Sequence, residues 1–206
     1  MEQIILTGFE PFGPYKLNPT EESTNYFNGK QLGNYYITGI VLPCTYFGAF
    51  EALKKVILDV KPVAIVSTGL SSSVKGIRFE STGRNIMGGK YADADGYDPK
   101  DLPLIKGGKE FLNTNSNNCG LANILNSSGL PIEMSANADK FICNSLIYLT
   151  TNYLQINNPE IKNAFFHTPW TDNYKSKIEL KPDKVMIPQK MLYSSIELVI
   201  QNIAKD

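Results

Sequence analysis

Short apolar runs that alternate with helical patterns constrain the fold of this chain more than any other feature of its sequence. The runs are rich in β-branched or aromatic residues and end at Gly or Pro, as strands do. They are Gln3–Thr7, Tyr35–Leu42, Val63–Thr68 and Ala164–Thr168. Helical patterns lie between and after them, at Thr20–Phe27 with Thr20 as the N-cap, at Phe47–Leu58, after Cys143 and at Gln189–Ala204. This alternation predicts an α/β fold with three layers around a mostly parallel, mixed and twisted sheet.

The chain of 206 residues carries no Pro/Ser-rich or charged linker, so we expect a single domain over residues 1–206. Residues 69–119 are rich in Gly, Asn and Ser and fit the alternation poorly. We expect long loops there, and long loops on a compact α/β scaffold are often functional.

Composition excludes several classes of protein. Apolar residues make up 42% and charged residues 19% of the chain, which argues against a disordered protein. Twenty basic residues balance twenty acidic ones, which argues against a nucleic-acid binder. No run approaches the roughly 18 apolar residues of a membrane helix, and the N-terminus leads directly into a strand-like run. We therefore expect a cytoplasmic protein that binds neither nucleic acid nor membrane.

The sequence has few histidine or cysteine residues that could ligate a metal and none of the common cofactor-binding motifs. It has one histidine, His167, and three cysteines without a C-x-x-C pair, which argues against zinc modules and disulfide frameworks. Gly83–Lys90 has the glycines and lysine of a phosphate loop, but the lysine is one place late and no Ser or Thr follows it. Neither G-x-G-x-x-G nor G-x-S-x-G occurs. We expect no metal and no cofactor.

Cysteine–histidine chemistry is the better candidate. A thiol attacks as the thiolate, so it needs a base, and a helix N-terminus helps to lower its pKa. Cys143 lies near the start of a predicted helix, and His167 ends an apolar strand, where ligand crevices form in such sheets. A buried structural cysteine and a hydrogen-bonded structural histidine are the alternatives, and spacing alone leaves them open.

For the other candidate residues the sequence gives weaker support for a functional role. We interpret Cys44 and Cys119 as incidental. Glu80 lies in a Gly-flanked loop, where it is either solvated or positioned to orient an imidazole. Phe9 and Phe12 follow the first strand and belong either to the core or to the wall of an apolar pocket.

Four short motifs follow one another along nearly the whole chain. They are Thr7–Gly13 followed by Asn18-Pro19-Thr20, then Glu80 with Asn85, Asp93 and Gly96 through Pro99, then Phe141–Asn144 with Tyr148, and finally Phe166–Pro169. In order and spacing they resemble the motifs of the pyroglutamyl peptidase type I family of cysteine peptidases, also called pyrrolidone-carboxylate peptidases. The resemblance implies an α/β/α sandwich and the removal of N-terminal pyroglutamate from peptides.

The resemblance also implies roles for individual residues. Cys143 is expected to be the nucleophile, His167 the general base and acid, and Glu80 the carboxylate that orients the imidazole. The walls of a pocket for the lactam ring are expected from Phe9, Phe12 and Phe141. A pyroglutamyl terminus carries no ammonium group, so apolar walls with a few polar partners suffice to recognise it. We also expect a homo-oligomer, either a dimer or a tetramer.

The chain departs from the family pattern around this constellation. Within Gly69–Phe79 it has Leu70–Val74 where a Gly-Gly-Arg pattern is expected, and Ser81 replaces a basic residue after the glutamate. Lys90 stands where the family carries an arginine of the oxyanion site, and the two side chains differ in geometry and hydration. Around the pocket, Tyr91, Ala92 and Ala94 also replace typical residues.

The sequence therefore supports two hypotheses about function, one for an active enzyme and one for a family member with altered or no catalysis. The first is a working cysteine exopeptidase that forms an acyl-enzyme. The second is a family member that is weak, altered in specificity, or only binds pyroglutamyl termini. Retention of cysteine, histidine and glutamate together favours the first. A nucleoside phosphorylase on a similar scaffold is a third reading, but it would require a phosphate site that the sequence lacks.

Overall fold

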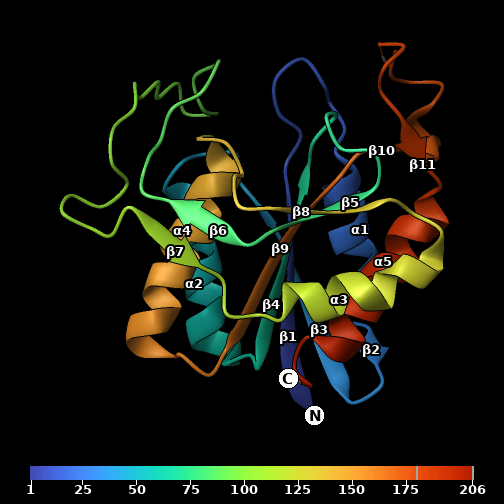
Figure 1. Ribbon diagram of the computed structural model, residues 1–206, viewed down its shortest axis with the longest axis horizontal. Coiled ribbons are helices and arrows are strands. Elements are labelled where there is room, and N and C mark those ends of the chain that lie inside the picture. Colours follow the sequence, from blue (N-terminus) through green and yellow to red (C-terminus); the bar gives the residue numbers. More distant parts are fainter. Residues whose placement is uncertain (180, 206) are drawn as a thin grey trace.

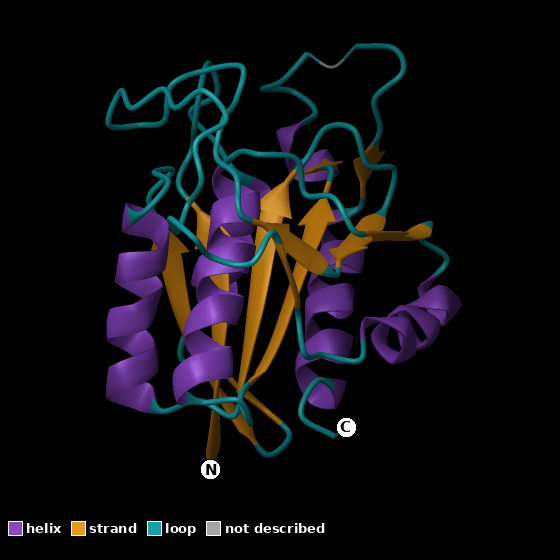
Figure 2. Cartoon of the chain, turned by 60° about the vertical axis from the view of Figure 1, so that its left-hand side comes forward, coloured by secondary structure: helices purple, strands orange, loops and turns teal. Residues whose placement is uncertain are grey.

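The computed structural model describes residues 1–179 and 181–205, and it has helices on both faces of a central sheet (Figures 1 and 2). The strands are β1 (Glu2–Phe9), β2 (Gln31–Leu32), β3 (Tyr35–Leu42), β4 (Ala64–Leu70), β5 (Ile77–Glu80), β6 (Thr82–Arg84), β7 (Phe111–Asn113), β8 (Ile132–Ser135), β9 (Lys162–Thr168), β10 (Trp170–Thr171) and β11 (Met186–Ile187). The helices are α1 (Pro19–Phe27), α2 (Gly48–Val60), α3 (Asn118–Leu125), α4 (Ile142–Asn157) and α5 (Gln189–Asn202). Within the two described ranges, no helix is long and apolar enough to cross a membrane.

The central sheet has the strand order β2-β3-β1-β4-β9-β5-β8. β1 pairs in parallel with β3 and β4, β4 with β9, and β5 with β8. β2 runs antiparallel to β3, and β5 antiparallel to β9. The sheet is therefore mixed and mostly parallel, which confirms the predicted α/β fold of three layers. The carboxyl ends of β1, β4 and β9 lie side by side at the end of the sheet where the irregular loops gather (Figure 2).

Side-chain alternation along the strands divides the core into two layers, because successive residues of a strand point to opposite faces. On one face, Ile65 and Phe165 pack with α2 and α4. On the other face, Val66 and Phe166 pack with α1, α3 and α5. Strands that are apolar on both faces are thus covered on both, as their sequence predicted.

The same alternation decides which face carries the predicted site residues. His167 is two residues beyond Phe165, so it points to the face that α2 and α4 cover. Phe79 packs in the opposite core layer, so its neighbours Arg78 and Glu80 point to the α4 face as well. The topology therefore brings the end of β9, the strand β5 and the N-terminus of α4 together.

Two local expectations were wrong. Thr20 is not the N-cap of α1, because Pro19 is already the first helical residue and Asn18 caps the helix. The Asn18 side-chain oxygen accepts from the Thr20 backbone N–H at 3.0 Å and from its hydroxyl at 2.8 Å. Glu80 is not in a loop, because it is the last residue of β5, whereas the long loops expected within 69–119 are present beside β5, β6, β7 and the start of α3.

The long loop between β6 and β7 is held by two buried or half-buried polar side chains. The Asn85 amide bonds both the N–H and the C=O of Ile105, each at 2.8 Å. The Asp93 carboxylate accepts from the backbone N–H groups of Tyr46, Asp95 and Tyr97 at 3.1, 3.0 and 2.9 Å. These bonds replace a regular ladder, so the loop is ordered by side chains that the resemblance had singled out.

Candidate active site

His167 is fixed at the carboxyl end of β9 by a buried carboxylate. Its Nδ1 lies 2.7 Å from Glu80 Oε1, and the two side chains are 6% and 0% exposed. An ionised carboxylate only accepts hydrogen bonds, so Nδ1 carries a proton, and in the neutral imidazole Nε2 is then the lone-pair acceptor. The histidine therefore has the tautomer that a general base requires.

Several contacts keep the Glu80 carboxyl group ionised. Burial alone would raise the pKa of Glu80, but the hydrogen bond and charge of His167, with smaller contributions from Ser135 and Arg78, lower it below its usual range. The Arg78 Nε donates to the same Oε1 atom at 2.8 Å. Glu80 Oε2 is buried and has no hydrogen-bond partner among the described residues.

Cys143 is the second residue of α4, and Asn144 holds this end of the helix. The Asn144 side chain is fully buried. Its Oδ1 accepts from the Arg84 N–H at 2.8 Å, while its Nδ2 donates to the carbonyls of Arg84 at 2.9 Å and Ile86 at 2.8 Å. These three bonds tie the helix start to β6 and so fix the position of the cysteine.

Gly69 shows that the thiol and the imidazole are neighbours. Gly69 pairs with His167 in the β4–β9 register. A Cβ added to it would lie 3.0 Å from Cys143 Sγ, 3.1 Å from His167 Cδ2 and 2.8 Å from the Phe165 ring. Sulfur and imidazole therefore lie close to the same point of the backbone, and a larger residue there would displace them.

The Cys143 thiol differs from expectation in its protonation. A helix N-terminus lowers a thiol pKa, but here burial raises the pKa of Cys143, and Cys44 and Glu80 raise it further. In the free protein the group is therefore a thiol rather than a preformed thiolate. Attack then requires that a base remove the proton during the reaction.

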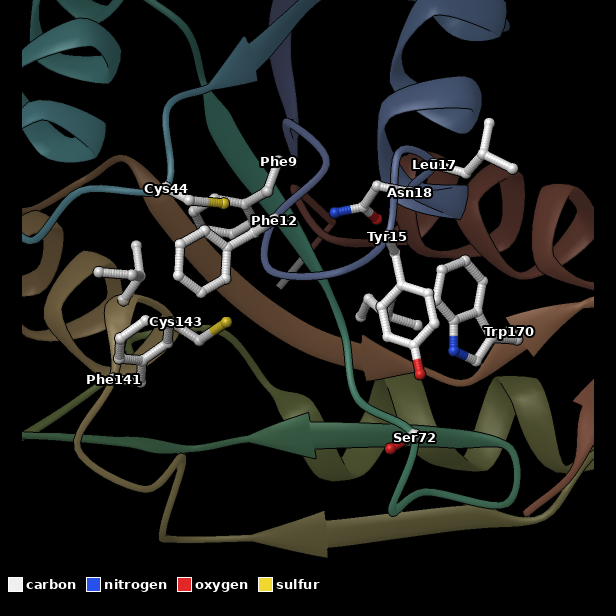
Figure 3. Close-up of a pocket in the computed structure, with 12 residues that line it drawn as sticks. Phe9, Phe12, Tyr15, Leu17, Asn18, Cys44, Ser72, Phe141, Cys143 and Trp170 are labelled. Carbon is white, nitrogen blue, oxygen red and sulfur yellow. The ribbon is translucent and has the colours of Figure 1, made fainter. Parts of the chain in front are cut away.

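A pocket of about 240 Å³ opens beside the sulfur (Figure 3). It is lined by Phe9, Phe12, Tyr15, Leu17, Asn18, Cys44, Leu70, Ser72, Phe141, Ile142, Cys143 and Trp170. None of these twelve lining residues is charged, and the Phe12 and Phe141 rings lie 5.4 Å apart. Tyr15 packs edge-on against Trp170 at the other end of the pocket from Phe141. Such a pocket suits a small uncharged group.

The structure brings most of the predicted site residues together. Phe9, Phe12 and Phe141 line the pocket with Cys143, while His167, bonded to Glu80, lies beside Cys143 near Gly69. Lys90 does not line this pocket. Its exposed ammonium lies 5.3 Å from the centre of the Tyr91 ring and borders a neighbouring cavity, which shares only Phe141 with the first. Its role in the oxyanion site stays a prediction.

Sequence reasoning missed some residues of the site. Cys44, interpreted as incidental, lines the pocket, and burial raises its pKa to about 12. Tyr15 and Trp170 gave no periodic signal, because each lies in an irregular segment or a very short strand. Arg78 precedes Glu80 by two positions on β5, so the two share a face, but Glu80 was expected in a loop and this spacing therefore gave no signal.

Comparisons with known proteins identify the family of the chain. The family profile described as pyroglutamyl peptidase matches residues 2–205. A pyrrolidone-carboxylate peptidase of Thermococcus litoralis is 31% identical over 171 residues, covering 83% of this chain and 78% of the relative. One from Halalkalibacterium halodurans is 34% identical over 167 residues, covering 81% of this chain and 83% of the relative. The solved structure of the Thermococcus litoralis protein superposes with a TM-score of 0.92 at 28% identity, covering 100% of this chain and 94% of that one. With the family profile spanning nearly every residue, the chain belongs to the pyroglutamyl peptidase family.

Proposed function

We propose that the protein is a cysteine exopeptidase that removes N-terminal pyroglutamate from peptides. The observation that carries this proposal is the His167–Glu80 hydrogen bond of 2.7 Å beside Cys143, at a pocket without charged lining residues. A base held in one tautomer next to a thiol is suited to nucleophilic catalysis. The family of the chain supports the same chemistry.

In the proposed reaction, the Cys143 sulfur attacks the carbonyl carbon of the pyroglutamyl residue while its proton passes to His167 Nε2. Glu80 holds Nδ1 and stabilises the imidazolium that forms. The imidazolium then donates its proton to the leaving amine, and an acyl-enzyme remains on Cys143. Water, deprotonated by the same imidazole, hydrolyses the thioester and releases pyroglutamic acid.

Recognition and charge stabilisation fall to different groups. Phe9, Phe12 and Phe141 enclose the lactam ring, which has no charge to satisfy. The backbone N–H of Cys143, at the positive end of α4, donates to the oxyanion. Lys90 supplies a second, cationic donor once its side chain turns from Tyr91 toward the intermediate.

Several wider properties belong to the same proposal. The substrates are peptides that begin with pyroglutamate. The protein works in the cytoplasm as a homo-oligomer, without nucleic acid, membrane or cofactor. The balanced charge of the chain supports the absence of a nucleic-acid partner, and its single histidine supports the absence of a metal cofactor.

The direct test is the release of a chromogenic amine from its pyroglutamyl amide by the purified protein. We expect turnover by the parent, none by Cys143→Ala, and a fall of several orders of magnitude for His167→Ala. Glu80→Gln should lower turnover less than His167→Ala, because it removes the group that orients the imidazole rather than the base itself. A prolyl amide, which has an amine in place of the lactam, is the control substrate and should not be cleaved. Full activity in Cys143→Ala would overturn the assignment.

A further inference from the structure

Arg78 shares a single carboxylate oxygen with the imidazole of His167. Its Nε donates to Glu80 Oε1 at 2.8 Å, and the same oxygen lies 2.7 Å from His167 Nδ1. Arg78 is also the direct cross-strand partner of His167 in the β5–β9 pair. The guanidinium and the imidazole are therefore neighbours on one face of the sheet, bridged by one buried oxygen atom.

From this arrangement we infer that Arg78 is a positioning residue of the site. Its guanidinium fixes the Glu80 carboxylate against His167 and balances the carboxylate charge, so that the imidazole stays neutral and can accept the Cys143 proton. The catalytic part of this inference rests on the proposed function. The electrostatic part depends only on the geometry.

The charge balance follows from the groups that face the imidazole. The Glu80 anion stabilises the protonated form of His167, whereas the adjacent Arg78 cation destabilises it. Cys143 from α4 and Cys44 from the segment after β3 also face the site, but burial raises the pKa of both thiols, so they are uncharged at neutral pH. Among the described residues, Arg78 is thus the cation in contact with Glu80 that offsets its charge.

Because it is largely buried, this contact is screened by solvent and salt less than a surface ion pair. Glu80 is fully buried, and the Arg78 side chain is 21% exposed. The resemblance leads us to expect a cation at three places; Lys90 carries one, whereas the segment Leu70–Val74 and Ser81 do not. Val74 is buried and apolar, and the Ser81 hydroxyl donates to the Ser135 carbonyl at 3.1 Å. Arg78 supplies the missing charge from the same strand as Glu80.

The test follows the protonation of His167 directly. Because the chain has one histidine, its imidazole resonances can be assigned in an NMR pH titration without ambiguity. In Arg78→Met we expect the midpoint to rise by roughly one pH unit, the low end of the shift that a charge at this range produces. Glu80 remains ionised across this range, so its anion then stabilises the imidazolium unopposed. Arg78→Lys should restore most of the parent midpoint.

Matched variants separate charge from other effects. Lys75→Met removes one positive charge from an exposed position just before β5 and should leave the midpoint unchanged. Arg78→Gln keeps a hydrogen-bond donor without the charge, and it should raise the midpoint even if Arg78→Met does not fold. An unchanged midpoint in Arg78→Gln or Arg78→Met, or an equal rise in Lys75→Met, would overturn the inference.

Kinetics on the pyroglutamyl amide test the catalytic part. In Arg78→Met the acid limb of the kcat/KM profile should shift to higher pH together with the NMR midpoint. A shift of one unit lowers kcat/KM about tenfold at any pH below the limb. A midpoint that rises while the limb stays in place overturns the positioning role. If the parent cleaves no pyroglutamyl amide but the midpoint still rises, the proposed function fails and the charge balance around His167 stands.

Discussion

General-base activation requires that the Cys143 thiol give its proton to the neutral imidazole of His167. Burial holds the cysteine as a thiol, and the Glu80 hydrogen bond selects the tautomer that leaves His167 Nε2 free. A preformed thiolate would need a nearby cation, and the described structure places Arg78 against Glu80 instead. The pair therefore fits general-base activation during attack better than a standing ion pair.

Variants of Lys90 test how the negative charge of the tetrahedral intermediate is stabilised. A well-placed oxyanion donor is worth about 10² to 10³ in kcat, but the Lys90 ammonium is exposed and must lose water before it helps. We expect Lys90→Ala to lower kcat about 10- to 100-fold. Lys90→Arg should raise kcat more than it lowers KM, because the gain belongs to the transition state. Steady-state kinetics on the pyroglutamyl amide give both values.

Lys106→Ala is the matched control, since it removes an exposed lysine from the same long loop without bordering either cavity. If Lys90→Ala keeps the kcat of the parent, Lys90 is only a hydrated surface charge. Another group then completes the oxyanion site.

At the scale of elements, the strands and helices were more predictable than the segments between them. Tyr35–Leu42 is a strand over its whole predicted length, and α4 begins where Cys143 required a helix N-terminus. Both depend on local periodicity, which a sequence displays directly. The predicted fold class followed from the alternation of such elements.

The pocket wall was harder to predict, because its members come from irregular segments that long-range contacts order. Tyr15 and Trp170 meet across more than 150 positions, and no local pattern links them. The position of His167 at the end of a strand was predicted from the sequence, whereas Glu80 was expected in a loop and instead ends β5. Arg78 escaped notice because strand β5 is only four residues long and sits among glycines and serines.

Asn144 is the element-scale link between α4 and β6, so its removal should affect both stability and turnover. Asn144→Ala leaves one N–H and two carbonyls of the β6 segment without their buried partner. Each unsatisfied buried group costs about 1–3 kcal/mol, so we expect the free energy of unfolding to fall by about 3 kcal/mol. We expect kcat to fall as well, because Cys143 loses its fixed position.

Asn152→Ala is a matched control on the same helix, at a half-buried position away from β6. Asn152→Ala should lower the free energy of unfolding much less than Asn144→Ala does, and it should leave kcat unaltered. Urea unfolding and steady-state kinetics measure both quantities. A stability equal to the parent in Asn144→Ala would show that the helix start is held by packing alone.

At the scale of the whole molecule, the buried Glu80 couples the stability of the fold to pH. The folded protein lowers the pKa of Glu80 below its usual value, mainly through His167 against the opposing effect of burial. A group with a depressed pKa stabilises the folded state fully above the unfolded carboxyl pKa of about 4.3. That contribution is lost as the pH falls through the lower, folded value.

Glu80→Gln should therefore be less stable than the parent at pH 7, and the difference in the free energy of unfolding should shrink as the pH falls through and below about 4.3. Urea unfolding at a series of pH values measures this difference directly. Glu160→Gln, which changes an exposed carboxylate without an ion pair in the described structure, should show a small and constant difference. Apart from residue 80 the two proteins carry the same titratable groups, so a difference that depends on pH reports the native contacts of Glu80. A gap between parent and Glu80→Gln that stays constant from pH 7 to pH 3 would mean that Glu80 is not held as an anion, and the assigned His167 tautomer would lose its support.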